Sequence, residues 1–331
     1  MTRAAISSAP MSISHSVLDV RSLAAELARR YTFDGPPVCQ LFYRGMNDIY
    51  IVHDDARRYA LRAWRANWRS VNDVTYELEF LDFLQSRKIP VAGGIKAIDG
   101  SPFFLADVPE GPRPIGLFQW AEGKKFGAAP DAGVARNMGA MFARIHIAGA
   151  DFRPSVARTA NPSTAFLANL VYLKELLFDR PDDLKLYTHV AEALTRAVKG
   201  VETSLPRGPN HGDFHFNNVH VKPGGDFTLL DFDNAGDDCF IQDLACYTWA
   251  NNYGGHDPIY AEAFIEGYGA VRALTADEKA SFDLFLLAKE FRLLVGFTKH
   301  MNCIGHAPLR FRDLDWFATS ISSRAQGLGL L

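Results

Sequence analysis

The sequence has few cysteines and no long apolar run. Its four cysteines lie far apart, without the CxxC spacing typical of zinc and redox sites, and they suggest no disulfide framework. We therefore expect a protein of the reducing cytoplasm. No stretch approaches the roughly 18 apolar residues of a membrane span. The opening, MTRAAISSAPMSISHS, also lacks the apolar segment of a secretory signal, so we expect no membrane partner.

A strong excess of charge is missing too. The net charge is −3 over 331 residues, which argues against the basic surface of a general nucleic-acid-binding protein. Hydrophobic residues make up 48% of the chain, enough for a sizeable core. The length is typical of two lobes rather than one compact core. The sequence therefore predicts a two-lobed globular protein without a nucleic-acid partner.

The first 120 residues have mostly strand character. Residues 17–31 form the exception at the start, because apolar side chains recur there at helical spacing. Residues 38–65 contain beta-rich runs around the turn GMND, and 71–89 predict a second helix. Residues 90–123 then offer short apolar runs separated by glycine and proline, which indicate further strands.

The chain changes to helical character after about residue 130. Apolar residues at helical spacing predict helices over 134–152, 162–178, 184–205, 257–271 and 275–301. The fold class expected from both halves is α+β, with a small antiparallel-sheet lobe and a larger helical lobe. We predict a flexible tail over 1–15, a nucleotide-binding lobe over 16–120, and a lobe over 121–331 with the catalytic loop, metal and acceptor sites.

One polar stretch interrupts the helical half. HGDFHFNN, residues 211–218, places an asparagine five residues after Asp213, and a short apolar strand then ends at Asp231. Phosphoryl transfer needs a carboxylate for the attacking hydroxyl and oxygen ligands for Mg²⁺. The order of these residues is the one that kinases use, so the stretch favours a phosphoryl-transfer site.

HGDFHFNNV, LLDFDNAG and IQDLA together resemble the aminoglycoside phosphotransferase and choline kinase family, which has the protein-kinase-like fold. The resemblance covers roughly residues 35–300. It implies a bilobal fold, ATP or GTP as phosphoryl donor, Mg²⁺, and a small hydroxylated acceptor. That acceptor is an amino-sugar, amino alcohol, homoserine, sugar or nucleoside-like compound. We expect its contacts within about 245–300, in a monomer or homodimer.

The resemblance also implies roles for residues of the motif. Asp213 is similar to the catalytic base, and Asn218 and Asp231 are similar to the metal ligands. Asp233 resembles a more variable acid near the substrate or a second metal. His211 resembles a residue that supports the loop.

The remaining assignments come from the same resemblance. Asp243 is similar to the buried acid that holds the catalytic loop's backbone. In RGMNDIYIV, Gly45 and Asn47 resemble a loop that covers the nucleotide. Trp120 lies in the connector expected to pass the adenine.

The resemblance fails at one position. In YALRAW the expected phosphate-binding lysine is Arg62, with Glu77 as its helix partner. Arginine keeps the positive charge, but the two side chains are not interchangeable. This departure leaves open a pseudokinase that binds a nucleotide without transferring phosphate.

A second alternative comes from the histidines of the motif. His211, Asp213 and His215 alternate, so on a strand they would share one face and could hold a transition metal. That arrangement would make the protein a metal-dependent hydrolase. It leaves Asn218 and Asp231 without a role.

Overall fold

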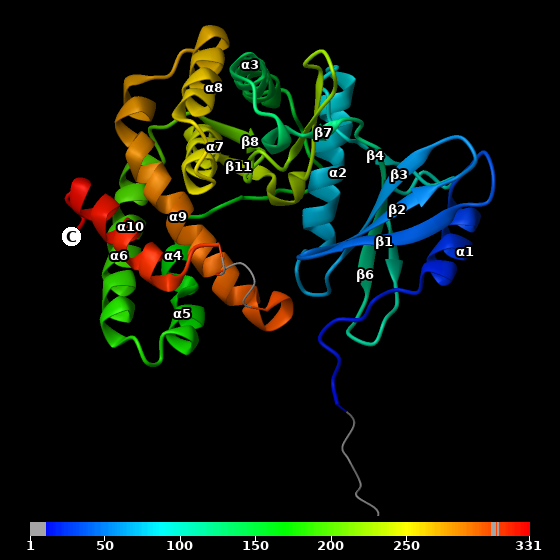
Figure 1. The fold of residues 1–331 in the computed structure, drawn as a ribbon, viewed down its shortest axis with the longest axis horizontal. Coiled ribbons are helices and arrows are strands. Elements are labelled where there is room, and N and C mark those ends of the chain that lie inside the picture. Colours follow the sequence, from blue (N-terminus) through cyan, green and yellow to red (C-terminus); the bar gives the residue numbers. More distant parts are fainter. Residues whose placement is uncertain (1–10, 306–308, 310) are drawn as a thin grey trace, which may run out of the picture. The chain divides into compact units, whose positions relative to one another are not determined.

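The computed structural model describes residues 11–305, 309 and 311–331 (Figure 1). By the packing of the chain, the protein divides into two units. The sheet unit comprises the chain up to Ser70 and Ile95–Phe118, and the helical unit comprises Val71–Gly94 and Gln119–Leu331.

This division differs from the predicted lobes in one segment. Residues 71–94 pack with the helical unit, whereas the predicted nucleotide-binding lobe includes them. The assignment of nucleotide and acceptor functions to the lobes stays a prediction.

The sheet unit consists of one helix and a mainly antiparallel sheet (Figure 1). The strand order is β1-β2-β3-β6-β4, and β5 pairs with β6. Strands β1, β2 and β3 form successive antiparallel hairpins, as the sequence predicts. The elements are α1 (Val20–Arg30), β1 (Val38–Arg44), β2 (Asn47–His53), β3 (Arg58–Trp64), β4 (Gly94–Ile95), β5 (Phe104–Ala106) and β6 (Arg113–Gln119).

Helix α1 is stabilised by a side-chain cap at its first turn and by burial of its apolar face. The Asp19 carboxylate caps its first turn by accepting a hydrogen bond from the Ser22 amide at 2.8 Å. Leu23 and Leu27 are buried in one core cluster with Tyr50 and other apolar side chains of the sheet. The predicted first helix is confirmed, and its apolar face closes the core of the sheet unit.

The sheet unit also buries a group of charges. The Arg113 guanidinium is fully buried and donates to Asp48 at 2.8 Å and to the main-chain oxygen of Trp64 at 2.8 Å. His15 Nε2 lies 2.9 Å from Oδ2 of Asp48, the same carboxylate oxygen that accepts from Arg113. His15 is therefore packed into the sheet unit, whereas the sequence predicts it as the last residue of the flexible tail 1–15. Residues 1–10 of that tail lie outside the described part of the chain.

The helical unit contains most of the chain (Figure 1). Its helices are α2 (Val71–Ser86), α3 (Ala132–Gly149), α4 (Ala165–Ala168), α5 (Leu170–Leu176), α6 (Pro181–Val201), α7 (Ile241–Tyr253), α8 (Pro258–Val271), α9 (Ala276–Ile304) and α10 (Leu314–Gly327), with the short 3-10 turns η1 (Phe126–Ala128) and η2 (Phe232–Asn234). Its strands form two small antiparallel sheets, β10-β9-β7 and β11-β8. The strand bounds are β7 (Lys124–Lys125), β8 (Arg207–Asn210), β9 (Val219–Val221), β10 (Phe227–Leu229) and β11 (Gly236–Cys239).

Sequence patterns predict part of this unit. Four of the five predicted helices and the β9-β10 hairpin are present, and the helix predicted over 162–178 is instead two short helices, α4 and α5. Helices α7 and α10 and the pair β8-β11 were not predicted. Strands β8 and β11 are short and rich in glycine, proline and aspartate, residues disfavoured in strands. Within the described residues, no helix combines the length and apolar character that a membrane span needs.

Two glycines set the packing of α3 on α8. A β-carbon on Gly139 would lie 1.9 Å from the main-chain oxygen of Phe264, and one on Gly267 would lie 1.9 Å from that of Arg136. Each helix therefore presents a glycine where the other helix's backbone comes closest. This close contact holds α3, which carries His146 beneath the motif.

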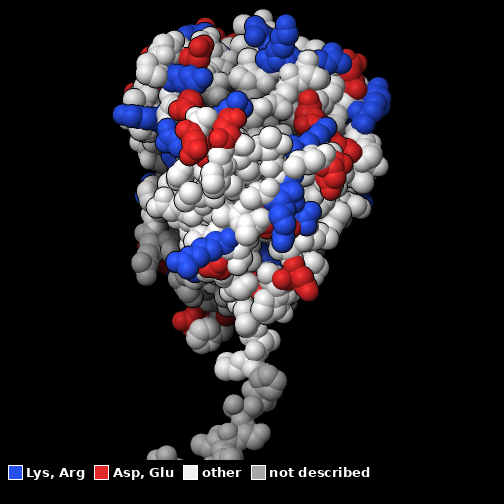
Figure 2. Space-filling view, turned by 90° about the vertical axis from the view of Figure 1, so that its right-hand side faces the viewer, with Lys and Arg blue, Asp and Glu red and all other residues white. Residues whose placement is uncertain are grey.

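Charged side chains of both signs mix on the surface. On the face that Figure 2 shows, lysines and arginines alternate with aspartates and glutamates in small groups. This distribution agrees with the small net charge of the sequence, −3.

Candidate active site

The loop HGDFHFNN is held from below by one buried carboxylate. Asp243 on α7 accepts hydrogen bonds from the His211 and Gly212 amides, each at 2.8 Å. The His211 ring donates from Nε2 to the main-chain oxygen of Leu230 at 2.8 Å. Gly212 has φ +82°, and a β-carbon there would lie 2.3 Å from the main-chain oxygen of Asn234. The start of the loop is therefore fixed at main-chain atoms, and position 212 requires glycine.

Asp243 is itself supported by a second buried layer. Burial disfavours its charged form, but the hydrogen bond from His146 Nε2 at 3.2 Å and the loop amides outweigh that cost, so the pKa of Asp243 lies below its usual range. The other ring nitrogen of His146, Nδ1, lies 2.8 Å from the Tyr268 hydroxyl, and the ring stacks on Phe240. The ionised Asp243 is thus part of the packed scaffold of the loop.

Asp213 follows this anchored start. Its Oδ1 lies 2.6 Å from the ammonium of Lys289 on α9 and 3.8 Å from the Cys246 sulfur on α7. The Asp213 side chain is 31% exposed, whereas that of Lys289 is only 10% exposed. The carboxylate is therefore partly open to solvent, and the lysine contacts it from the buried side of the helical unit.

The ion pair changes the acid–base properties of both groups. Burial alone would raise the pKa of Asp213, but the charge and hydrogen bond of Lys289, together with His215 and His211, outweigh it and hold that pKa well below the usual range. The same carboxylate keeps the pKa of Lys289 above its usual value despite burial. Burial lowers the pKa of His215, the second histidine of the loop. At neutral pH the candidate base is ionised and is a weak base.

Sequence reasoning missed Lys289. It lies in LFLLAKEFRLL, where a lysine, a glutamate and an arginine interrupt an otherwise apolar run of a predicted helix. Charged residues are almost never fully buried unless they are paired, so this interruption was a usable signal. The neighbouring Glu290 is fully buried and accepts from the Trp249 indole at 3.1 Å.

The two predicted metal ligands come from the end of the loop and from the strand that follows. The Asn218 side-chain nitrogen donates to the main-chain oxygen of Asp213 at 2.9 Å, so its amide oxygen is the atom left for a ligand. Asp231 follows β10, is exposed, and has a left-handed backbone with φ 62° and ψ 61°. Such a conformation is uncommon for a residue other than glycine and is frequent at functional sites.

Residues on either side of Asp231 are anchored. Phe232 is buried, and its ring lies 4.3 Å from the His211 ring. Asp233 is 4% exposed, and its main-chain oxygen accepts a hydrogen bond from Arg158 at 2.7 Å. Asp231 is thus the exposed member of a packed DFD segment. Amide and carboxylate oxygens of this kind are the ligands that Mg²⁺ takes in proteins, so the donor set fits that ion.

Three predicted nucleotide residues lie in the sheet unit. The turn between β1 and β2 is closed by a hydrogen bond from the Gly45 amide to the Asn47 oxygen at 3.1 Å. The Arg65 guanidinium donates to the Gly45 oxygen at 2.8 Å and fixes the turn from β3's end. Arg62 on β3 is 9% exposed, and its guanidinium lies 4.9 Å from the centre of the Phe118 ring.

Two other predicted residues belong to the helical unit. Glu77 lies on α2 and is 1% exposed. Trp120 is half-buried, and the next residue's main-chain oxygen, that of Ala121, accepts from His220 Nδ1 at 2.9 Å. Because Arg62 and Glu77 belong to different packing units, their pairing stays a prediction.

The alternative metal cluster is wrong. The His211 ring is turned toward Leu230 on one side, and its Nδ1 accepts from the Asp213 amide at 3.4 Å on the other. His215 Nδ1 accepts from the Asn217 amide at 3.2 Å. Among the residues that the structure describes, no three histidine, cysteine, aspartate or glutamate side chains are placed to hold a metal. The loop is not a strand, so the H-x-D-x-H residues do not share a face.

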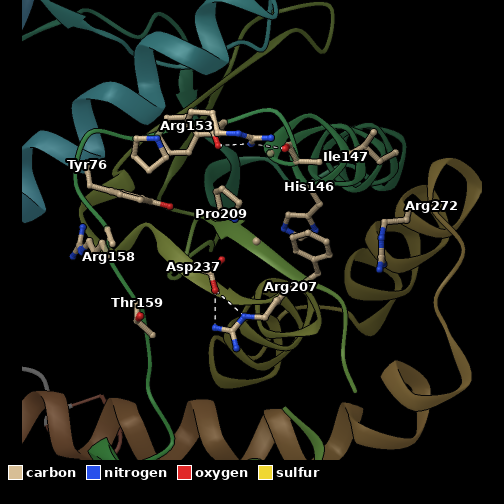
Figure 3. A pocket seen from close by; sticks show the side chains of 17 residues that line it. Tyr76, His146, Ile147, Arg153, Arg158, Thr159, Arg207, Pro209, Asp237 and Arg272 are labelled. Atoms are coloured by element: carbon tan, nitrogen blue, oxygen red, sulfur yellow. Dashed lines mark hydrogen bonds and ion pairs between the residues drawn. The ribbon is translucent and has the colours of Figure 1, made fainter. Parts of the chain in front are cut away.

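A separate cavity of about 680 Å³ lies on the β8-β11 side of the helical unit (Figure 3). His146, Pro209 and an ion pair between Arg207 and Asp237, 2.6 Å apart, line it. Asp213, Asn218 and Asp231 do not line it. It adjoins the support of the loop through His146, and it is not the candidate reaction centre.

A sequence profile described as the phosphotransferase enzyme family matches residues 45–280. The matched region includes the loop, the DFD segment and Asp243. The chain belongs to the phosphotransferase enzyme family. The resemblance seen in the sequence is confirmed.

Individual relatives agree with this assignment. The phosphotransferase is 30% identical to an uncharacterized protein of Deinococcus radiodurans over 83% of this chain and 81% of the relative. It is 28% identical to a homoserine kinase of Polaromonas naphthalenivorans over 74% of this chain and 76% of that enzyme. The structure of the amicoumacin kinase hAmiN, in complex with AMP-PNP, Ca²⁺ and Ami, superposes with a TM-score of 0.77 at 18% identity, covering 93% of this chain and 94% of that one.

These findings establish the fold and the enzyme class. The phosphotransferase has the kinase-like fold, with an antiparallel sheet followed by a helical region, and it is a small-molecule phosphotransferase.

Proposed function

We propose that the enzyme transfers the γ-phosphoryl group of ATP, or of GTP, to a hydroxyl of a small molecule, with Asp213 as the base. The observation that carries this proposal is the placement of Asp213. Its backbone and Oδ1 are held by Asn218 and Lys289, while the side chain remains 31% exposed. A carboxylate fixed in this way can orient an acceptor hydroxyl.

The transfer proceeds by direct displacement. The acceptor oxygen forms a bond to the γ-phosphorus as the bond to the β–γ bridging oxygen breaks, and the electron pair of that bond leaves with the nucleoside diphosphate. The hydroxyl proton passes to Asp213. Because its lowered pKa makes Asp213 a weak base, the proton moves late, and the main contribution of the carboxylate is to orient the hydroxyl.

Asn218 and Asp231 are the proposed ligands of Mg²⁺, which would supply charge neutralisation for the nucleotide phosphates. Asp233 is a proposed neighbour of the substrate or of a second metal. In the sheet unit, Gly45 and Asn47 would cover the phosphates and Arg62, steadied by Glu77, would pair with them.

The acceptor is a small hydroxylated compound. Several relatives are named homoserine kinases, and structural neighbours are named as kinases of an aminopropanol and of antibiotics. We include homoserine, amino alcohols, amino-sugars, sugars and nucleoside-like compounds among the proposed acceptors. A coupled assay with ATP and with GTP over this panel identifies both substrates.

The decisive variant is Asp213→Asn. We expect phosphoryl transfer to fall by about 10²–10⁴-fold, the usual contribution of a general base, while nucleotide binding stays within a few-fold. Asp226→Asn, in the exposed turn before β10, is the matched control. Transfer by Asp213→Asn within 10-fold of the wild type would contradict the proposal. So would a wild-type protein that binds nucleotide but phosphorylates no acceptor.

Asp231→Ala tests the metal assignment separately. We expect the Mg²⁺ concentration for half-maximal nucleotide binding to rise at least 10-fold, measured by titration at fixed nucleotide. An unchanged Mg²⁺ dependence would remove Asp231 from the ligand set.

A further inference from the structure

We propose that Lys289 is a positioning residue for phosphoryl transfer, which holds one oxygen of Asp213 so that the other faces the acceptor hydroxyl. This inference rests on the proposed function of Asp213. It assigns a role to a buried cation that lies 76 residues after Asp213, on α9.

The first argument is the division of labour between the two carboxylate oxygens. Oδ1 accepts from the Lys289 ammonium at 2.6 Å and lies 3.8 Å from the Cys246 sulfur. Within the described part of the chain, Oδ2 has no hydrogen bond. A carboxylate that is held at one oxygen can rotate little, so Oδ2 is the oxygen left for the hydroxyl.

The second argument is that both ends of Asp213 are fixed. The side-chain amide of Asn218 donates to its main-chain oxygen at 2.9 Å, and Lys289 fixes Oδ1. A displacement of about 1 Å at a reacting group can cost about 10²-fold in rate. By positioning Asp213, Lys289 can therefore change the rate without contacting the substrate.

The third argument is the burial of the lysine itself. Lys289 is 8% exposed and lies between Ala288 and Glu290, which are both fully buried. A buried ammonium is costly unless it is paired. Lys289 forms its ion pair with Asp213, a carboxylate that also serves the reaction. An apolar residue at 289 would fill the same helix face without the free-energy cost of burying a charge, so packing alone does not explain the lysine.

The experiment is a double-mutant cycle on purified enzyme with the acceptor and nucleotide that the panel identifies. Lys289→Met removes the charge and keeps most of the volume. We expect kcat to fall by about 10–100-fold with the KM values for both substrates changed less than about 3-fold. In the Asp213→Asn background, the same substitution should change kcat by less than about 2-fold, since Lys289 acts through the missing carboxylate.

A structural role gives a different pattern. If Lys289 only stabilises the fold, Lys289→Met lowers the melting temperature and reduces kcat equally in both backgrounds, which overturns the proposal. An unchanged kcat in the wild-type background also overturns it. Lys279→Met, at an exposed position of the same helix, is the matched control and should change nothing.

Two measurements keep the test decisive. If Lys289→Met does not fold, Lys289→Gln replaces it, because its side chain stays polar but is uncharged and one bond shorter, so that it no longer holds Oδ1. Loss of transfer in Lys289→Gln, again only in the presence of Asp213, supports the proposal, and equal loss in both backgrounds overturns it. Failure of the proposed function is recognised separately, because Asp213→Asn would then retain full transfer.

Discussion

The loop side and the predicted nucleotide side of this enzyme are built in different ways. The loop from His211 to Asn218 is held by hydrogen bonds from main-chain atoms to Asp243, a residue that stands in its own short motif. The predicted nucleotide turn at Gly45 is held by the side chain of Arg65, which belongs to no recognised motif. The first arrangement demands particular residues at fixed spacing. The second accepts any cation that reaches the turn from the neighbouring strand.

The difference explains which parts a sequence can reveal. Asp213, Asn218, Asp231 and Asp243 stand at spacings set by one loop and the strands that follow, so one continuous stretch identified them. On the nucleotide side, Arg62 replaces the expected lysine without disturbing its strand. The positive charge and the strand position that the resemblance implies are kept there by a different residue.

Of the substitutions that test how rigidly the loop is held, Gly212→Ala is expected to have the largest effect. The new β-carbon would lie 2.3 Å from the main-chain oxygen of Asn234 at a backbone φ of +82°, so the loop must move. We expect phosphoryl transfer to fall at least about 10²-fold. Gly200→Ala, where nothing lies within 4 Å of the added carbon, is the control and should be stable and active. Equal activity of the two variants would show that the loop is not held as described.

Asp243→Asn tests the support beneath the loop. One amide oxygen cannot satisfy both buried main-chain amides and His146, so we expect a loss of about 2–4 kcal/mol in unfolding free energy. The pKa of Asp243 is lowered in the folded protein, so its stabilisation is present above the ordinary carboxyl pKa and is lost as the pH falls through the lower, folded value.

Denaturation with urea at several pH values checks this sign. The stability difference between wild type and variant should be constant from pH 7 to pH 5 and should shrink only below about pH 4, the usual aspartate range. A difference that shrinks as the pH rises would contradict the ionised state of Asp243.

Arg65→Met tests the nucleotide turn. We expect the KM for the nucleotide to rise about 10-fold with kcat nearly unchanged, because the turn loses one charged hydrogen bond of about 1.5 kcal/mol. Arg21→Met, at an exposed position on α1, is the control. A fall in kcat with no change in nucleotide KM would place Arg65 with the loop side instead.

The smallest effect is expected from Arg62→Lys. The substitution keeps the charge and loses the guanidinium's contact with the Phe118 and Trp64 rings, worth about 0.5–1 kcal/mol. We therefore expect a change of about 2–5-fold in nucleotide KM. A change above 100-fold, in either direction, would show that the identity of this cation is as strictly required as the residues of the loop.

Much of the fold followed from local patterns. Period and length predicted α1, α2, α3, α6, α8 and α9, because each has an apolar face or a clear cap. The capping box of Thr275 and Glu278 at the start of α9 is one such signal. The pair β8-β11 escaped prediction because its stability comes from pairing across 25 residues of intervening chain, not from strand-forming residues.

The site was predictable to the same limit. The sequence indicated candidate residues in the loop, after β10 and on α7, whose roles stay predictions, but it did not indicate Lys289. Lys289 reaches Asp213 from the middle of α9, and His146 reaches Asp243 from α3. Their positions depend on how the helices pack, and no spacing along the chain encodes that.

Asp231 has a consequence for the enzyme's history. Its left-handed backbone suits glycine or asparagine at least as well as aspartate, so the backbone conformation alone does not require this side chain. In a lineage that no longer needed the reaction, we expect position 231 to drift early toward glycine or asparagine, leaving an intact and inactive descendant.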